Sequence, residues 1–295
     1  MNTCMSRHHG RTLGKVCSWV AALLSVSAES AATAPEASSA LPTPNPQTLQ
    51  SLREVRALAG NPLYLPPSDG LPGVLAYPPQ DTSAPASVTV FLHGMCDTPQ
   101  NECPYFASSV TRKDWLLCPR ADANCTNGGA TWGWRTRQQT VELAIERIRL
   151  TYPGALDDTG ARTLIGFSLG SFAALDVAHQ GAGKWKYLLL IGAKILPNAR
   201  LLERAGVHRV LLASGDFDMM KSHMVEQSRL LDRRGMPSAY RSLGRVGHTF
   251  APDMDIWMTG ALTWLHADEE RPAEPSVATR SRSNRTSVDK TKIAF

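Results

Sequence analysis

The sequence predicts an α/β protein in which a mostly parallel central sheet is covered by helices on both faces. Three observations support this fold class: short continuous apolar runs, amphipathic stretches between them, and a length of 295 residues, which can bury a full core. Apolar runs that do not alternate with polar residues are typical of strands buried on both faces. The composition agrees with a globular domain, because 43% of the residues are hydrophobic and 19% are charged.

The first 28 residues have the pattern of a secretory signal peptide. A basic stretch ending at Lys15 precedes the apolar segment VCSWVAALLSV (residues 16–26), and small residues follow. This segment is too short to span a bilayer. We therefore expect residues 1–28 to be removed, which leaves a secreted or periplasmic protein with no stable membrane span. An uncleaved N-terminal anchor is the alternative.

Three further segments follow the signal. Residues 29–47 are rich in Ala, Ser and Pro and predict an extended linker. Residues 48–267 carry the alternating apolar and amphipathic stretches, so we expect them to form one α/β domain. Residues 268–295 contain almost no apolar side chains and cannot offset the entropy of an ordered chain. They predict a disordered polar tail.

Five apolar runs predict the central strands of this domain. They lie at residues 88–92, 115–118, 163–167, 187–191 and 209–214. Apolar residues at helical spacing predict helices around residues 141–148 and directly after residue 168. A helix around residues 220–234, a possible strand at 238–243 and a closing helix that includes residues 257–265 complete the domain.

The charge balance gives no reason to expect a nucleic-acid partner. The formal net charge is +5, but three basic residues lie in the first 28 positions, where no acidic residue occurs. The remainder is nearly balanced, and no run of Lys or Arg is interleaved with aromatic residues.

Four cysteines lie beyond the signal, at Cys96, Cys103, Cys118 and Cys125. They allow three pairings, and each of the two nearest pairs is separated by six residues. In an oxidising compartment we therefore expect disulfides Cys96–Cys103 and Cys118–Cys125. A zinc site is the competing interpretation, but the CxxC spacing is missing, and we expect no metal.

Ser168 is the candidate nucleophile, because it lies in GFSLG (residues 166–170) between a predicted buried strand and a predicted helix. A sharp strand-to-helix turn lifts the hydroxyl above the sheet and aims the backbone N–H of Leu169 at the charge that develops during attack on a carbonyl. Gly166 and Gly170 relieve the crowding at such a turn. An ordinary hydroxyl in a turn is the alternative, because the five-residue pattern also arises by chance.

Suitable partners for Ser168 follow in the chain order serine, acid, histidine. The stretch GDFD (residues 215–218) comes after a predicted strand, and His248 follows the next one. In this arrangement His248 deprotonates Ser168, and Asp218 orients the imidazole. Spacing alone leaves Asp216 open as the acid.

A second part of the candidate site follows the first central strand, at HGMC (residues 93–96). The backbone N–H of Met95 is the expected second donor to the oxyanion, and His93 is expected to be structural. An ordinary turn after a strand is the alternative.

Together, six motifs resemble the α/β-hydrolase superfamily, and especially its phospholipase/carboxylesterase and acyl-protein thioesterase branch. The motifs are LHGM (residues 92–95), LCPR (117–120), ATWGW (130–134), GFSLG (166–170), GDFD (215–218) and GHTF (247–250). The resemblance covers roughly residues 86–266. It implies a serine hydrolase with no metal or organic cofactor, and it assigns the triad acid to Asp218. Leu169 and Ser171 depart from this branch, which often has Gln and Gly there, and these departures concern the substrate class more than the mechanism.

We therefore expect a secreted serine hydrolase that cleaves a small-molecule or lipid-like acyl ester, or a thioester, through an acyl-enzyme. Trp132 and Trp134 are candidates for lining the substrate pocket, and Met219 for an apolar rim; alternatively, these side chains support the core. Peptidase or amidase activity, polyester depolymerisation and acyl transfer would use the same triad. A catalytically silent binding protein of the same fold is the remaining alternative.

Overall fold

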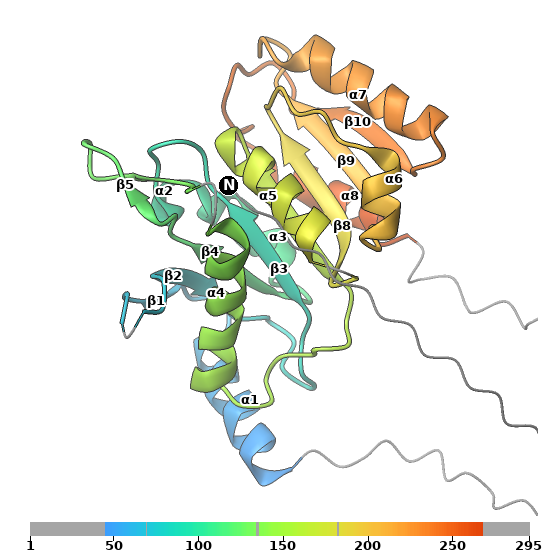
Figure 1. Ribbon diagram of the computed structural model, residues 1–295. Coiled ribbons are helices and arrows are strands. Elements are labelled where there is room, and N and C mark those ends of the chain that lie inside the picture. Colours follow the sequence, from blue (N-terminus) through green and yellow to red (C-terminus); the bar gives the residue numbers. More distant parts are fainter. Residues whose placement is uncertain (1–44, 69, 134–135, 182, 268–295) are drawn as a thin grey trace, which may run out of the picture. The chain divides into compact units, whose positions relative to one another are not determined.

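The central sheet confirms the predicted fold class. The computed structural model describes residues 45–267 except 69, 134–135 and 182; the expected signal, nearly all of the linker and the polar tail lie outside these residues. Within them, eight strands form one sheet in the order β1-β2-β4-β3-β7-β8-β9-β10 (Figure 1). Their bounds are β1 Leu63–Leu65, β2 Val74–Tyr77, β3 Val88–Leu92, β4 Trp115–Pro119, β7 Arg162–Phe167, β8 Trp185–Ile191, β9 Arg209–Ser214 and β10 Ser238–Ser242. All pairs from β4 to β10 are parallel, whereas β2 is antiparallel to both its neighbours.

Helices cover both faces of the sheet, as predicted. Helices α3 and α8 pack against each other on one face, and α4 and α5 lie together on the other (Figure 1). The helices of the described region are α1 Pro46–Leu58, α2 Pro99–Glu102, α3 Pro104–Val110, α4 Arg137–Thr151, α5 Leu169–Gln180, α6 Ala199–Arg204, α7 Lys221–Arg233 and α8 Met254–Leu265. None of these described helices is long and apolar enough to cross a membrane.

Burial on both faces explains why the central strands read as continuous apolar runs. Leu164 and Ile165 are neighbours on β7, yet Leu164 packs in the core cluster beneath α4 and α5, and Ile165 packs in the cluster beneath α3 and α8. Successive side chains of a strand point to opposite faces, so each face needs its own apolar residue. Truncating either side chain to Ala would cost about 2 to 5 kcal/mol of folding free energy.

Helix α1 begins at Pro46, two residues before the expected start of the domain. The side-chain oxygen of Asn45 accepts a hydrogen bond from the Thr48 N–H at 2.8 Å and caps the helix. Leu52 and Val55 are buried, so α1 is attached to the sheet by its apolar side. The Pro-rich composition before Thr48 concealed this start, because Pro is also favoured at the first position of a helix.

The disulfide pairing predicted from the sequence is wrong. The bonds are Cys96–Cys125 and Cys103–Cys118 in place of Cys96–Cys103 and Cys118–Cys125. The expected pairing treated both six-residue intervals as open loops, but α2 occupies most of the first, and the second holds the end of β4 and strand β5 (Ala123–Asn124). Cys103 lies at the junction of α2 and α3 and is buried against Cys118 of β4.

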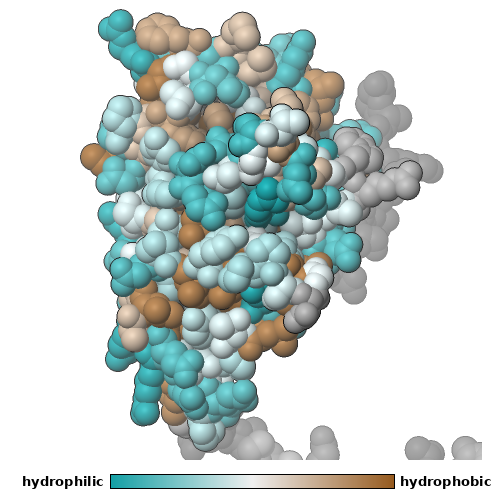
Figure 2. Space-filling view, turned by 90° about the vertical axis from the view of Figure 1, so that its left-hand side faces the viewer, coloured by the Kyte–Doolittle hydropathy of each residue, from teal (hydrophilic) through white to brown (hydrophobic). Residues whose placement is uncertain are grey.

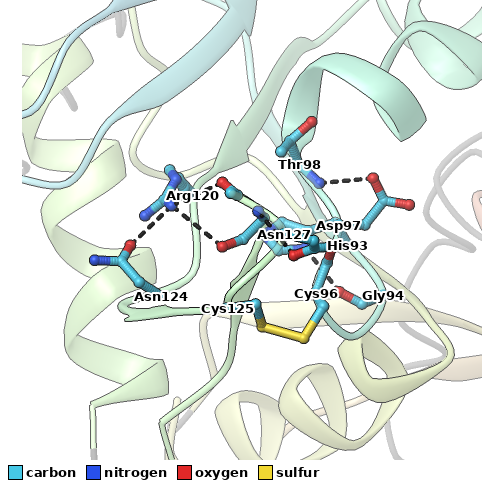
Figure 3. The surroundings of a disulfide bond; sticks show 11 residues. His93, Gly94, Cys96, Asp97, Thr98, Arg120, Asn124, Cys125 and Asn127 are labelled. Atoms are coloured by element: carbon cyan, nitrogen blue, oxygen red, sulfur yellow. Dashed lines mark hydrogen bonds between the residues drawn. A yellow bond between two sulfur atoms is a disulfide. The ribbon is translucent and has the colours of Figure 1, made fainter.

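The other bridge, Cys96–Cys125, attaches the segment after β3 to a small hairpin. Strands β5 (Ala123–Asn124) and β6 (Ala130–Thr131) form this hairpin, and the Ala130 N–H donates to the Asp97 carbonyl at 2.9 Å. Figure 3 shows the bridge beside His93 and Gly94, with the Asn127 side chain donating to the Cys96 carbonyl. Three separate contacts thus hold the segment 94–97.

Candidate active site

Ser168 sits in a sharp turn between β7 and α5. Its φ of 53° lies in the left-handed region, which a residue with a side chain rarely adopts. A Cβ atom on Gly166 would collide with the Gly170 carbonyl, and one on Gly170 would collide with the Leu92 carbonyl. The two glycines therefore let α5 begin directly against the ends of β7 and β3.

The same packing brings the segment after β3 to the serine turn. Leu92 of β3 is the register partner of Gly166 of β7, so the residues that follow each strand emerge side by side. Neither the Met95 N–H nor the Leu169 N–H donates a hydrogen bond to a described residue. Both expected oxyanion donors are thus free of partners in the described part of the chain.

Asp218 and His248 are in direct contact, although the chain separates them by 30 residues. His248 Nδ1 lies 2.9 Å from Asp218 Oδ2, and Asp218 Oδ1 accepts the Met220 N–H at 2.9 Å. The Asp218 side chain is 3% exposed, whereas His248 is 45% exposed. The imidazole therefore has one edge on a buried carboxylate and the other open to a ligand.

Backbone hydrogen bonds fix the acid-bearing loop to the histidine-bearing loop. The Phe217 N–H donates to the Val246 carbonyl at 3.0 Å, and the Asp216 N–H donates to the Gly244 carbonyl at 2.8 Å. A Cβ on Gly215 would collide with the carbonyls of Val246 and Gly247. This close approach is a reason for glycine at the first position of the GDFD stretch.

Asp216 has different partners from Asp218. Its carboxylate accepts hydrogen bonds from Lys221 Nζ at 2.8 Å and from Ser242 Oγ at 2.7 Å. These bonds, that from Lys221 first, hold the pKa of Asp216 below its usual range. Asp216 thus ties the loop to α7 and β10, and the contact with His248 belongs to Asp218.

His248 lies close to the serine turn. Its ring packs on Phe167, the residue before Ser168, with 4.9 Å between ring centroids. Among the described residues, no hydrogen bond joins Ser168 Oγ to His248. In enzymes without bound substrate, catalytic hydrogen bonds are often long and shorten when the substrate arrives.

His93 has both ring nitrogens engaged beneath this site. Nε2 accepts the Ala121 N–H at 3.1 Å, so Nδ1 carries the proton and donates to the Gly94 carbonyl at 2.8 Å. Burial lowers the pKa of His93 and favours this neutral form. Trp132 Nε1 donates to the His93 carbonyl at 2.8 Å. These contacts agree with a structural role for His93.

The residues expected to line the substrate pocket have different environments. Trp132 is buried in the core, which favours the alternative that it supports the fold. Trp134 lies outside the described residues. Met219 is 87% exposed, whereas Met224, five positions later, is fully buried. The methionines after the acid therefore divide between an exposed position and the core.

Two buried residues, Ser171 and Gly192, support the site in ways that the sequence did not indicate. Ser171 Oγ contacts the carbonyls of Gly166 and Ile191 at 2.7 and 2.9 Å and accepts the Ile191 N–H at 3.0 Å, so it joins the ends of β7 and β8 under the serine turn. Gly192 has a φ of 62°, and a Cβ there would lie 3.0 Å from His248 Cε1 and 3.1 Å from Asp218 Oδ2. In the sequence, the importance of Gly192 could have been inferred from its position directly after a predicted buried strand.

The described part of the chain also contains a cavity of about 570 Å³. It is lined by parts of segments 67–73, 120–122 and 136–143, and none of Ser168, Asp218 and His248 contributes to its wall.

The side of the molecule that carries β1 and the β5–β6 hairpin is mostly hydrophilic, with small hydrophobic groups between (Figure 2). The described residues contain no group of three or more His, Cys, Asp or Glu side chains placed to hold a metal ion.

Comparison with known proteins identifies the fold. No protein-family model matches the sequence, and no curated protein matches it. Among solved structures, the chain is similar to an S-formylglutathione hydrolase from Staphylococcus aureus, with a TM-score of 0.54 and 16% identity over 69% of this chain and 95% of that chain. A fluorophosphonate-binding serine hydrolase from the same organism matches with a TM-score of 0.53 and 16% identity over 69% and 96% of the two chains.

An esterase from the archaeon Pyrobaculum calidifontis is similar as well, with a TM-score of 0.54 and 13% identity over 76% of this chain and 92% of that chain. At such low identities, structural similarity establishes the fold and does not transfer an activity. The chain has the α/β-hydrolase fold, and its structure resembles those of serine hydrolases and esterases.

Proposed function

We propose that this protein is a secreted serine hydrolase that cleaves carboxylic esters through a Ser168–His248–Asp218 triad. The observation that carries the proposal is the hydrogen bond between His248 and the buried carboxylate of Asp218, next to a serine in a strained strand-to-helix turn. A buried carboxylate, a half-exposed imidazole and a serine at the carboxyl edge of a parallel sheet are the parts that acyl transfer requires.

In the first half of the reaction, His248 acts as the base. Its Nδ1–H donates to Asp218, so the lone pair of the neutral ring is on Nε2. Nε2 accepts the proton of Ser168 Oγ while Oγ attacks the carbonyl carbon of the ester. The same proton then passes to the departing alkoxide, which leaves as the alcohol, and the acyl group remains on Ser168.

Charge develops on the carbonyl oxygen during this attack, and we assign its stabilisation to the N–H groups of Met95 and Leu169. Both lack other acceptors among the described residues. Preorganised backbone donors are effective here because they need no reorganisation at the moment of reaction. In the second half, His248 deprotonates a water that attacks the acyl-enzyme and releases the acid.

The exposed residues near the site favour an apolar acyl ester, either a small molecule or lipid-like. Met95, Leu196, Phe217 and Met219 each have more than half of their surface exposed, and they lie on the segments that follow β3, β8 and β9. Apolar side chains at these carboxyl ends would gain contact area with an acyl chain. One protein of similar structure, from Pyrobaculum calidifontis, is an esterase.

The cysteines support an extracytoplasmic location. Both disulfides lie within the domain, and such bonds persist in oxidising compartments. Together with the signal-like sequence of residues 1–28, they favour a secreted or periplasmic protein.

Active-site labelling tests the proposed function. The purified protein is treated with a fluorophosphonate probe, and the modified residue is located by mass spectrometry. We expect one adduct per chain, on Ser168, and we expect its rate of formation to fall at least about a hundredfold in His248→Ala. Hydrolysis of p-nitrophenyl esters of different acyl length then defines the substrate preference.

A matched control separates loss of the base from a general effect of replacing a histidine. His208 precedes β9 at the opposite end of the sheet, so His208→Ala should be labelled as fast as the unaltered protein. A folded protein without an adduct on Ser168 would contradict the proposed function and favour a binding protein of the same fold.

A further inference from the structure

Glu102 is a buried acidic residue that the proposed reaction does not use. It is the last residue of α2, and only 5% of its surface is exposed. Its Oε2 accepts the Gly94 N–H at 3.0 Å. A Cβ on Gly94 would lie 3.1 Å from Glu102 Oε1, so the carboxyl packs closely against this backbone. Gly94 directly precedes Met95, the expected oxyanion donor.

The other end of the same loop also contacts Glu102. The Glu102 carboxyl is hydrogen-bonded to the Asp97 side chain. Asp97 Oδ1 accepts the Thr98 N–H and the Asn101 side-chain amide, both at 2.7 Å. Figure 3 shows the Asp97–Thr98 bond beside the Cys96–Cys125 bridge. Glu102 thus spans the segment 94–97 from its first residue to its last.

Two carboxyl groups can share a hydrogen bond when one of them carries a proton. Burial, together with the bond to Asp97, raises the pKa of Glu102 to about 8. Burial acts to raise the pKa of Asp97 as well, but the hydrogen bonds from Asn101, Thr98 and Glu102 outweigh it and lower the pKa. At neutral pH, Glu102 is therefore the protonated partner and donates to Asp97.

We propose that Glu102 is a positioning residue that holds the segment 94–97 in the shape that presents the Met95 N–H to the oxyanion. The inference rests on the proposed function, because it assigns a role within the same site. The protonated carboxyl satisfies both ends of the segment at once: one oxygen accepts the Gly94 N–H, and the hydroxyl donates to Asp97. The left-handed conformation of Cys96, with φ of 56°, requires such support.

Loss of the Glu102 proton would leave two negative carboxylates in contact. Their repulsion would disturb the segment, and a buried negative charge next to Gly94 would oppose the oxyanion itself. Among the described residues, the other titratable groups on neighbouring elements are His93 after β3, Tyr77 on β2 and Tyr105 on α3, and the charged Arg120 after β4 acts on His93. Burial lowers the pKa of His93 and raises that of Tyr77, so both rings are neutral near pH 8. Cys103 and Cys118 are joined in a disulfide.

The test compares the pH dependence of kcat in the unaltered protein, Glu102→Gln and Glu102→Ala, with a short-chain p-nitrophenyl ester. The side-chain amide of Gln can accept a hydrogen bond from the Gly94 N–H and donate one to Asp97, but it does not titrate. We expect kcat of the unaltered enzyme to fall above pH about 8 and that of Glu102→Gln to stay level. At pH 7, kcat of the Gln variant should lie within about threefold of that of the unaltered enzyme. In the Ala variant kcat should fall by about tenfold or more, with a smaller change in KM.

Several outcomes would overturn the inference. The same alkaline fall in Glu102→Gln, or an unchanged kcat in Glu102→Ala at pH 7, would each do so. Glu203→Gln, at an exposed position of α6, is the matched control and should have the profile of the unaltered enzyme. Circular dichroism at each pH checks that the variants are folded, and the near-isosteric Gln variant remains informative if the Ala variant does not fold.

Failure of the proposed function can be distinguished from failure of this inference. If the probe labels Ser168 but the unaltered protein and Glu102→Gln have the same pH profile, the proposed function holds and the positioning role of Glu102 is refuted. If no ester is cleaved, the amide signal of Gly94 in an NMR titration still reports on Glu102. We expect that signal to shift around pH 8 in the unaltered protein and not in Glu102→Gln; a signal that does not move would refute the inference.

Discussion

Asp218 Oδ2 lies 2.9 Å from His248 Nδ1, and Asp216, two residues earlier on the same loop, is bound instead to Lys221 and Ser242. Two acids that spacing alone did not distinguish therefore have separate partners. The difference arises from the turn that follows β9, in which the Asp218 N–H donates back to the Gly215 carbonyl and directs the second acid inward.

This relationship predicts different effects for the two isosteric amide variants. Asp218→Asn should lower kcat by about 10³ to 10⁴, because the amide cannot stabilise the imidazolium and favours the wrong tautomer of His248. Asp216→Asn should leave kcat within about fivefold, since it removes a surface contact with Lys221. Steady-state kinetics with one ester measures both. A larger loss in Asp216→Asn would reverse the assignment of the acid.

Gly192 predicts a second effect on the site. Gly192→Ala should destabilise the fold by about 1 to 2 kcal/mol, because L residues adopt a positive φ at a cost. It should also lower kcat by about tenfold or more, since the new methyl group would lie 3.0 Å from the His248 ring and displace it. Urea unfolding and kinetics measure the two effects separately.

Gly235 provides the matched control for this variant. Its φ is 83°, and a Cβ there would meet no atom within 4 Å. Gly235→Ala should therefore show the stability loss without the loss of kcat. If both variants kept full kcat, the close contact between Gly192 and His248 would have no catalytic consequence.

The corrected disulfide pairing can be tested by peptide mapping under non-reducing conditions. Trypsin leaves Cys96 and Cys103 in one peptide, so a second cleavage at Asp97 or Glu102 is needed to separate them. We expect the peptide with Cys96 to be linked to that with Cys125, and the peptide with Cys103 to that with Cys118. A link from Cys96 to Cys103 would restore the pairing expected from the sequence.

Much of the fold was predictable because its signals are local. The buried strands β3, β7, β8 and β9 are continuous apolar runs, and each was predicted to within two residues at either end. The serine turn was recognisable because Gly166 and Gly170 flank Ser168 in a five-residue pattern, and a Cβ on Gly166 would collide with the Gly170 carbonyl within that stretch. Such features need little knowledge of distant parts of the chain.

The features that the sequence did not reveal depend on residues far apart in the chain. The partner of Cys96 is set by the β5–β6 hairpin, and the importance of Gly192 is set by His248, 56 positions later. Glu102 reads as an ordinary helical acid until the fold brings Gly94 against it. Composition and periodicity carry no information on such contacts, so these details required the structure.

The buried carboxyl of Glu102 predicts how folding stability depends on pH. Its pKa is about 8 in the folded protein against an ordinary value of 4.5, so between these values the folded state holds a proton that the unfolded state has released. Stability therefore falls as the pH rises from about 4.5 to about 8, with a limiting slope of about 1.4 kcal/mol per pH unit for this group. The Glu102→Gln variant lacks this contribution to the pH dependence of stability.

We therefore expect Glu102→Gln to gain stability relative to the unaltered protein as the pH rises from 5 to 8, by an amount on the order of a few kcal/mol. Urea unfolding of both proteins at pH 5, 6.5 and 8 measures the difference. The other acids contribute equally to the pH dependence of unfolding in both proteins, so their contributions cancel in the comparison. A difference that stayed constant with pH would mean that Glu102 is already ionised in the folded state, and the bond to Asp97 would then lack the proton it requires.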